Sequence, residues 1–114
     1  MERVAIPVVK GKLSEYFGHC NHYEIFEIDG ENIQSNEIEV LPHHDITKLP
    51  EWAVQQGITD IIAYKVDKKF LSLFTGNKIN LFIGVPINTP RILIEEYLSG
   101  NLKSDEKIIK EITE

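Results

Sequence analysis

The sequence has a single cysteine among its 114 residues, so the chain cannot form an intramolecular disulfide. A lone free thiol is typical of a reducing compartment, and we therefore expect a cytoplasmic protein. No run approaches the roughly 20 apolar residues that a membrane-spanning helix needs. Residues 4–9 have the pattern of a strand rather than of a secretory leader. The sequence thus predicts neither a disulfide-stapled nor a membrane protein.

Positive charge is also scarce. The chain has 12 Lys and Arg against 18 Asp and Glu, which gives a formal net charge of −6. The densest basic run is Lys65, Lys68 and Lys69, and Asp67 interrupts it. Because an acidic surface repels a phosphate backbone, we expect no nucleic-acid partner.

Signatures of common enzymes are missing as well. Residues 4–9 contain no Asp or Glu, whereas a two-metal nuclease needs carboxylates at the centre of its sheet. No Gly-x-Ser-x-Gly or phosphate-binding glycine loop occurs. A Cys20–His nucleophile pair is conceivable, but no oxyanion site or specificity pocket accompanies it. We therefore expect no enzyme activity.

What is present is a 42% hydrophobic chain, enough to bury a core without metal or disulfide staples. Continuous apolar residues at 4–9 predict a strand covered on both faces, with Pro7 suggesting a bulge or an unpaired position. Residues 10–21 are expected to form a loop. The turn Asp29-Gly30 then joins strands 23–28 and 32–41.

The pattern changes to alternating helices and strands after residue 46. Spacing and capping residues predict helices over 47–56, 68–76 and 90–98, with Asp67 and Thr89 as N-caps, and strands over 59–64 and 79–83. A hairpin followed by such alternation indicates an α/β protein with a mixed five-stranded sheet. Right-handed crossovers give the strand order 3-2-1-4-5, in which only strand 2 is antiparallel.

This topology brings the histidines and the cysteine to one edge of the sheet. The loop after strand 1, the start of strand 2 and the exit of strand 3 all lie where the parallel strands end, which is where ligands favour such sheets. The residues concerned are His19, Cys20, His22, His43 and His44. Thiolate and imidazole hold iron, iron–sulfur species, zinc or copper.

Plainer roles stand beside these. His43-His44 is compatible with a solvated loop, and Cys20 with a small buried apolar residue. The spacing His19-Cys20-x-His22 matches no closed zinc site, so an open site with few protein ligands is the metal-binding alternative. Trp52, at helical spacing from Leu49, is expected in the core.

An ordered set of segments resembles the dinitrogenase iron–molybdenum cofactor-binding family. The set spans residues 3–102 and comprises Ile6-Pro7-Val8, Leu13-Ser14-x-Tyr16-Phe17-Gly18-His19-Cys20, Leu49-Pro50-Glu51-Trp52, 57–63, 81–85 and 97–102. The resemblance implies a ribonuclease-H-like three-layer fold. It also implies a non-catalytic carrier that holds an iron–sulfur or iron–molybdenum-type cluster during nitrogenase-cofactor assembly, with a cluster donor or acceptor protein as partner.

The resemblance also implies site residues. His19 and Cys20 follow the signature directly and, with His43, are the expected metal ligands. Phe17 and Gly18 are expected to shape the loop. His22 and His44 are further cofactor-binding candidates, as is Lys65, which either pairs with an anionic cluster or is simply solvated.

Two departures from the family pattern favour an alternative. Tyr16 replaces the histidine usual before Phe-Gly, and Tyr64-Lys65-Val66-Asp67 replaces a glycine-rich turn. Such a turn lets a backbone approach a bulky anion. The alternative is a protein-interaction or regulatory domain of the same fold that no longer binds a cluster. In either case we expect one domain over residues 1–102 and a charged tail or short helix over 103–114.

Overall fold

The computed structural model describes residues 1–18, 20, 22–40 and 48–113. Its strands are β1 (Glu2–Val9), β2 (Lys12–Leu13), β3 (His22–Asp29), β4 (Asn32–Glu39), β5 (Asp60–Ile62) and β6 (Asn80–Phe82). Its helices are α1 (Leu49–Gln55), α2 (Lys68–Gly76), α3 (Pro90–Ser99) and α4 (Glu106–Thr113).

The sheet has the predicted order, β4-β3-β1-β5-β6. β3 runs antiparallel to both β1 and β4, while β1, β5 and β6 are parallel. The α/β class and the mixed sheet are therefore confirmed, and the ribonuclease-H-like name stays an implication of the resemblance. One strand was not expected: β2 lies in the predicted loop and pairs antiparallel with the end of β1, which gives six strands.

Pro7 lies within the regular pairing of β1, opposite Tyr23, without the bulge that the sequence suggested. Its carbonyl accepts a 2.9 Å hydrogen bond from the Ser14 N–H. Because the N and O of one strand residue point to the same side, the proline nitrogen faces the side where pairing with β5 ends at Ala5. The missing donor therefore breaks no ladder bond.

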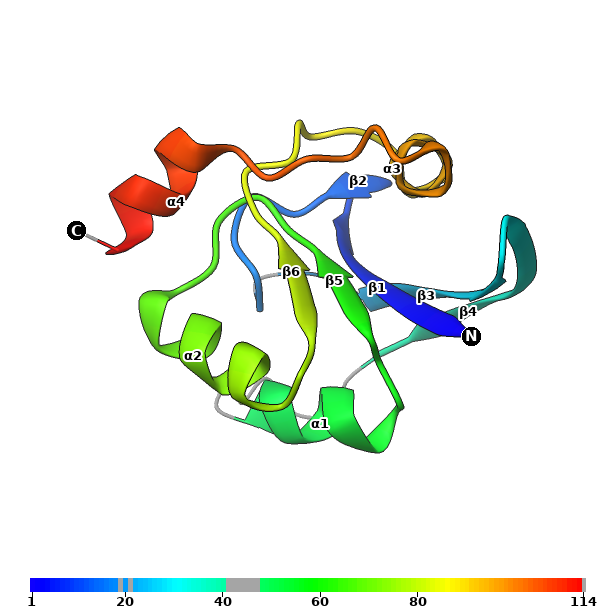
Figure 1. Cartoon of the computed structure of the whole chain (residues 1–114), viewed down its shortest axis with the longest axis horizontal. Coiled ribbons are helices and arrows are strands. Elements are labelled where there is room, and N and C mark those ends of the chain that lie inside the picture. The colour runs from blue at the N-terminus through cyan, green and yellow to red at the C-terminus, as the bar shows by residue number, and fades with distance from the viewer. Residues whose placement is uncertain (19, 21, 41–47, 114) are drawn as a thin grey trace.

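Helices cover both faces of the sheet (Figure 1). One core cluster lies under α1 and α2 and includes Ala5, Ile25, Ile61, Phe70 and Phe74. The other lies under α3 and includes Val4, Ile6, Phe26, Ile62 and Leu93. Strands alternate their side chains between faces, and the continuous apolar run of β1 supplies both clusters.

The helix N-caps predicted at Asp67 and Thr89 are confirmed. The Asp67 carboxylate accepts from the Lys69 N–H, the Thr89 hydroxyl accepts from the Ile92 N–H, and Gly100 ends α3 with φ +78°. Trp52 packs on the first cluster as expected, with its ring centroid 4.9 Å from that of Tyr23.

The C-terminal segment forms α4, which packs Ile108 and Ile109 on the first cluster. Just before it, the Asp105 N–H donates a 2.7 Å hydrogen bond to the Ile83 carbonyl at the end of β6. In Figure 1, α4 lies beside that end of the sheet. The division of the chain at residue 102 stays a prediction.

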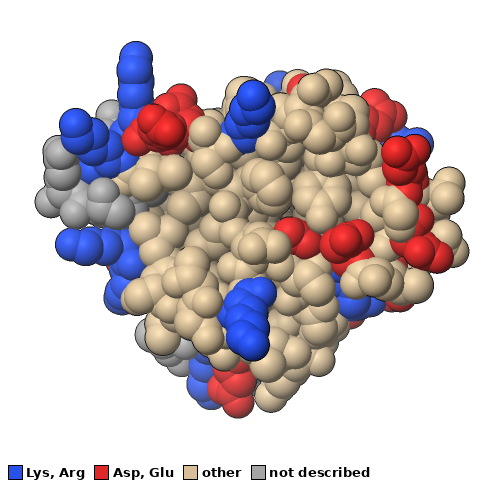
Figure 2. Space-filling model, in the orientation of Figure 1, with Lys and Arg blue, Asp and Glu red and all other residues tan. Residues whose placement is uncertain are grey.

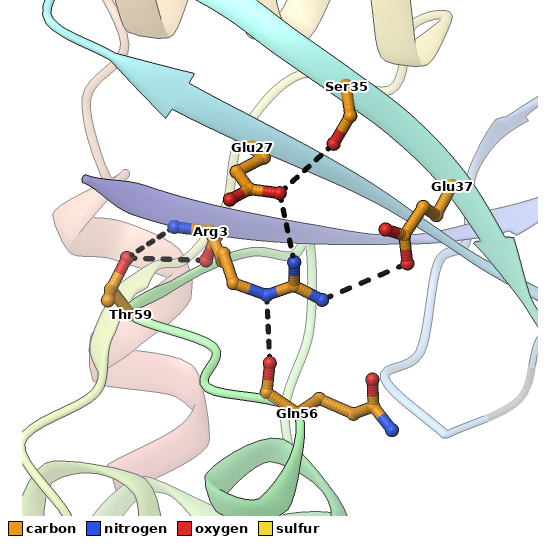
Figure 3. Close-up of polar contacts among 6 residues, drawn as sticks. All are labelled: Arg3, Glu27, Ser35, Glu37, Gln56 and Thr59. Carbon is orange, nitrogen blue, oxygen red and sulfur yellow. Dashed lines mark hydrogen bonds and ion pairs between the residues drawn. The ribbon is translucent and has the colours of Figure 1, made fainter.

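A polar network around Arg3, near the start of β1, joins the sheet to the C-terminal end of α1 (Figure 3). The Arg3 Nε donates a 2.8 Å hydrogen bond to the Gln56 carbonyl, and its guanidinium lies 3.4 Å from Glu27 and 3.9 Å from Glu37. Arg3 thereby connects β1, β3, β4 and the end of α1.

Candidate functional site

The loop that bears Tyr16, Phe17 and Cys20, here called the signature loop, is hydrogen-bonded to the segment that follows β5. Tyr16 and Lys65 form an isolated parallel bridge. The Phe17 N–H donates to the Lys65 carbonyl at 2.8 Å, and the Lys65 N–H donates to the Glu15 carbonyl at 3.1 Å. Segments about 50 residues apart thus share one sheet edge, as the predicted topology required.

Phe17 and Gly18 set the path of this loop. The Phe17 side chain is buried, and its ring packs edge-on against Phe74 and Tyr23 at centroid distances of 5.4 and 5.8 Å. Gly18 has φ +95°, a conformation that other residues adopt only with strain. The loop is therefore anchored on the core immediately before Cys20.

Cys20 is partly buried and packs against the first core cluster. Burial raises the pKa of its thiol, and this exceeds the opposing effect of contacts with the Tyr23 side chain and the Val8 backbone. The sulfur is therefore a protonated thiol at neutral pH. It becomes a good soft ligand only when a metal displaces its proton.

Tyr23 lies beside this thiol. Burial, followed by the charge of Cys20 and contact with it, raises the pKa of the Tyr23 phenol. The hydroxyl is buried and makes no hydrogen bond of good geometry with a described residue. The sequence did not identify Tyr23 as a site residue, because an aromatic residue in a strand is expected to lie in the core.

His22 and Cys20 are not brought together. His22 begins β3, where Tyr23 and Ile25 contribute to the first cluster and Phe26 and Ile28 to the second. Strand alternation places His22 on the α3 side of the sheet, whereas Cys20 packs on the α1–α2 side.

Lys65 does reach the signature loop. Its Nζ lies 5.6 Å from the centroid of the Tyr16 ring and 5.9 Å from that of Tyr64. These are cation–π distances. The residues that depart from the family pattern therefore contact one another, and they place a positive charge at this edge.

A groove of about 400 Å³ adjoins the loop. Its walls carry two ammonium groups, a carboxylate and a phenol, and its lining residues are Val9, Lys10, Lys12, Leu13, Ser14, Glu15, Tyr16 and Ile87. Lys10 and Lys12 were missed by sequence reasoning, which did not recognise the tight β1–β2 turn that presents them.

In the described ranges, no three His, Cys, Asp or Glu side chains are grouped as a metal site would require. The predicted ligands His19 and His43, and the cofactor-binding candidate His44, lie outside the described residues. Within the described chain, no helix is long and apolar enough to cross a membrane.

A separate polar centre lies at the other end of β5. Asp60 is buried, and its carboxylate accepts hydrogen bonds from Thr59 at 2.7 Å, Asn80 at 3.1 Å and Tyr97 at 3.2 Å. Burial, followed by the nearby charge of Asp60, raises the pKa of Tyr97. Because these three donors satisfy the carboxylate, we assign this group of residues a structural role.

The family model of the dinitrogenase iron-molybdenum cofactor matches residues 1–100. The chain belongs to this family. The match ends before α4, so that helix lies beyond the family pattern. No curated protein matches the chain.

Solved structures share the fold. PH0822 has a TM-score of 0.85 at 23% identity, over 95% of this chain and 98% of that one. The MJ0327 protein of Methanocaldococcus jannaschii has a TM-score of 0.73 at 20% identity, over 90% and 93%. The apo form of the orange protein from Desulfovibrio gigas has a TM-score of 0.70 at 17% identity, over 92% and 93%.

Proposed function

We propose that the protein binds an iron–sulfur or iron–molybdenum-type cluster as cargo at the edge formed by the signature loop and residues 64–66, and carries it without catalysing a reaction. The observation that carries this proposal is the bridge between Tyr16 and Lys65. It fixes the loop that bears Cys20 beside a lysine, and so puts a soft sulfur donor and a positive charge on one edge.

The donor set suits a carrier better than a permanent holder. Cys20 supplies one thiolate from a partly exposed position, and thiolates are the ligands that iron–sulfur species prefer. A site with few protein ligands leaves cluster positions for the donor or acceptor protein. His19 and His43 are proposed as further ligands, and His44 and His22 as weaker candidates.

Charge supports the same assignment. Biological clusters with thiolate and sulfide ligands are anionic, and Lys65 lies at the loop that would hold one. Lys10 and Lys12 line the adjoining groove. Figure 2 shows acidic groups gathered on the side of the molecule that carries the β3–β4 hairpin, whereas the basic groups of this face gather on the opposite side, with acidic groups beside them. We therefore propose a protein partner, rather than nucleic acid or a membrane, in the cytoplasm.

A second candidate is an interaction or regulatory domain that has lost the cluster. The specific observation in its favour is that the Lys65 ammonium lies against the rings of Tyr16 and Tyr64. These side chains take the place of the family's histidine and glycine-rich turn. Under this alternative, the side chains of Tyr16, Tyr64 and Lys65 occupy the position where a cluster would otherwise bind.

The deciding experiment is anaerobic titration of the purified chain with iron and sulfide, followed by iron quantification and visible absorption. The carrier proposal expects stoichiometric uptake that is lost in a His19→Ala/Cys20→Ala variant whose far-ultraviolet circular dichroism is unchanged. A Lys78→Gln variant, altered at an exposed position just before β6 and therefore at the opposite end of the sheet, is the control. Uptake no greater than that of an unrelated protein would favour the interaction domain.

A further inference from the structure

The hydroxyl of Tyr23 is buried, and its described polar neighbour is the thiol of Cys20. Tyr23 is 2% exposed, and its ring is held by Phe17 and Trp52 at centroid distances of 5.8 and 4.9 Å. These neighbours pack against the phenol ring in the core. Its hydroxyl nevertheless makes no hydrogen bond of good geometry with any described residue. Native proteins rarely leave such a group unsatisfied unless it serves something absent from the free chain.

The neighbour of this hydroxyl is the sulfur of the chain's single cysteine. Cys20 packs on the same core cluster. Contact with the Tyr23 side chain lowers the pKa of the Cys20 thiol, and contact with Cys20 raises the pKa of the Tyr23 phenol. A neutral thiol is a weak hydrogen-bond acceptor, so its contact with the Tyr23 hydroxyl satisfies that donor poorly. A thiolate sulfur is a charged acceptor, and hydrogen bonds to charged groups are stronger.

We propose that Tyr23 is a positioning residue of the cluster site, whose hydroxyl donates a hydrogen bond to the Cys20 sulfur when that sulfur binds a soft metal. The inference rests on the proposed function, because it needs Cys20 as a ligand. On binding, the S–H bond breaks, its proton leaves to solvent, and a sulfur–metal bond forms. The sulfur then carries the negative charge that the Tyr23 hydroxyl faces, and the donor orients the ligand and stabilises its charge.

Tyr97 provides a matched comparison within the same chain. It is also a tyrosine whose pKa is raised, but its hydroxyl already donates to Asp60 at 3.2 Å, at the opposite end of β5. Removing the Tyr97 hydroxyl breaks a bond that exists in the free protein. Removing the Tyr23 hydroxyl removes only its weak contact with the Cys20 thiol among the described residues.

The test uses the full chain and Cd²⁺ alone as a thiophilic probe. The variants are Tyr23→Phe, Tyr97→Phe and Cys20→Ser. Affinity is measured by competition with a chelator, with the thiolate-to-cadmium charge-transfer absorption as the readout, and stability by urea unfolding without metal. We expect Tyr23→Phe to weaken Cd²⁺ binding about tenfold or more while its urea midpoint stays equal or rises. Tyr97→Phe should lower the midpoint and leave Cd²⁺ affinity unchanged.

The outcomes separate this inference from the proposed function. If Cys20→Ser abolishes the charge-transfer band but Tyr23→Phe binds Cd²⁺ like the parent, the role of Tyr23 is overturned and the ligand assignment stands. A urea midpoint that falls in Tyr23→Phe as far as in Tyr97→Phe also overturns the inference, since the hydroxyl would then be satisfied in the free chain. If the parent gives no charge-transfer band, or Cys20→Ser keeps it, Cys20 is not the ligand and both proposals fail.

Discussion

The hydroxyl of Tyr97 on α3 donates a 3.2 Å hydrogen bond to the buried carboxylate of Asp60 on β5. Asp60 also accepts from Thr59 and Asn80, so residues from three parts of the chain converge on one carboxylate. This contact ties the helix over one face of the sheet to the sheet itself. It also makes the stability of the protein sensitive to alkaline pH.

The alkaline dependence follows from two tyrosines. Burial and a neighbouring acidic group raise the pKa of both Tyr97 and Tyr23. In the unfolded chain a tyrosine ionises near pH 10, whereas these two stay protonated in the folded protein. Above about pH 10 the unfolded state has therefore lost protons that the folded state keeps, and the free energy of unfolding falls as pH rises. Below that pH the contribution is fully present.

A Tyr23→Phe/Tyr97→Phe variant should show a shallower loss of stability as pH rises above about 10, measured by urea unfolding at a series of pH values. Each single variant should fall between the double variant and the parent. At pH 7, Tyr97→Phe should cost about 1–3 kcal/mol, because Asp60 loses a donor. A double variant that loses stability as steeply as the parent would contradict this account.

The contacts of Arg3 lead to a second prediction, which concerns the effect of a lysine substitution on stability. Its fork donates to the Gln56 carbonyl and lies near two glutamates, with the side chain 22% exposed. Lysine cannot reproduce a planar fork with several donors. Arg3→Lys should therefore lower the free energy of unfolding by about 1–2 kcal/mol.

Arg91 is the control for this substitution. It pairs with Glu95 at 3.2 Å within one turn of α3, but its side chain is 69% exposed. Exposed pairs of this kind contribute about 0.3–0.5 kcal/mol, so Arg91→Lys should be near neutral by urea unfolding. Equal effects of the two substitutions would mean that the Arg3 network does not stabilise the junction between sheet and helix.

A pair of glycines tests the packing of α4. Gly84 has φ +76°, and a Cβ there would lie 2.6 Å from the Asp105 Cβ and 2.9 Å from the Ile108 Cβ. Gly11 has φ +77°, but a Cβ there would meet nothing within 4 Å. Both alanine variants carry the backbone strain of a left-handed residue, about 1–2 kcal/mol. The clash is added only at position 84.

Gly84→Ala should therefore destabilise the protein more than Gly11→Ala. It should also speed hydrogen exchange of the amides at residues 105–110, which we would measure by mass spectrometry after pepsin digestion. If the two variants exchange alike in that segment, α4 is not held by its contact with Gly84.

Local chemistry made most of the fold predictable. Asp67 and Thr89 cap helices because their side chains accept from nearby N–H groups, and the Asp29-Gly30 turn fixes the hairpin. β2 was missed, because two residues carry no periodicity and the pairing is set by the sharp turn at Lys10 and Gly11. The sheet order came from crossover handedness, which needs no contact information.

The candidate site was only partly predictable, because side-chain direction depends on the strand's exact register. The structure places Lys65 beside the signature loop, whereas the sequence named this lysine only through the family resemblance. Topology could not show that His22 and Cys20 lie on opposite sides of the sheet, nor that the Tyr23 hydroxyl contacts the thiol. To predict them, one would have to know where β3 starts to within one residue.

The charge of Lys65 gives the sharpest test of cargo binding that leaves the ligands intact. If the cluster is anionic, Lys65→Gln should weaken its binding by a few-fold, and most at low ionic strength, because salt screens a partly exposed charge. Lys78→Gln, with the same charge change at an exposed position at the opposite end of the sheet, should leave binding unchanged. Both variants have equal net charge, so a general electrostatic effect would shift them together. The measurement is iron retained after anaerobic gel filtration at low and high salt. Equal retention by both variants at low salt would show that Lys65 does not face the cargo and that its ammonium only stacks on Tyr16 and Tyr64.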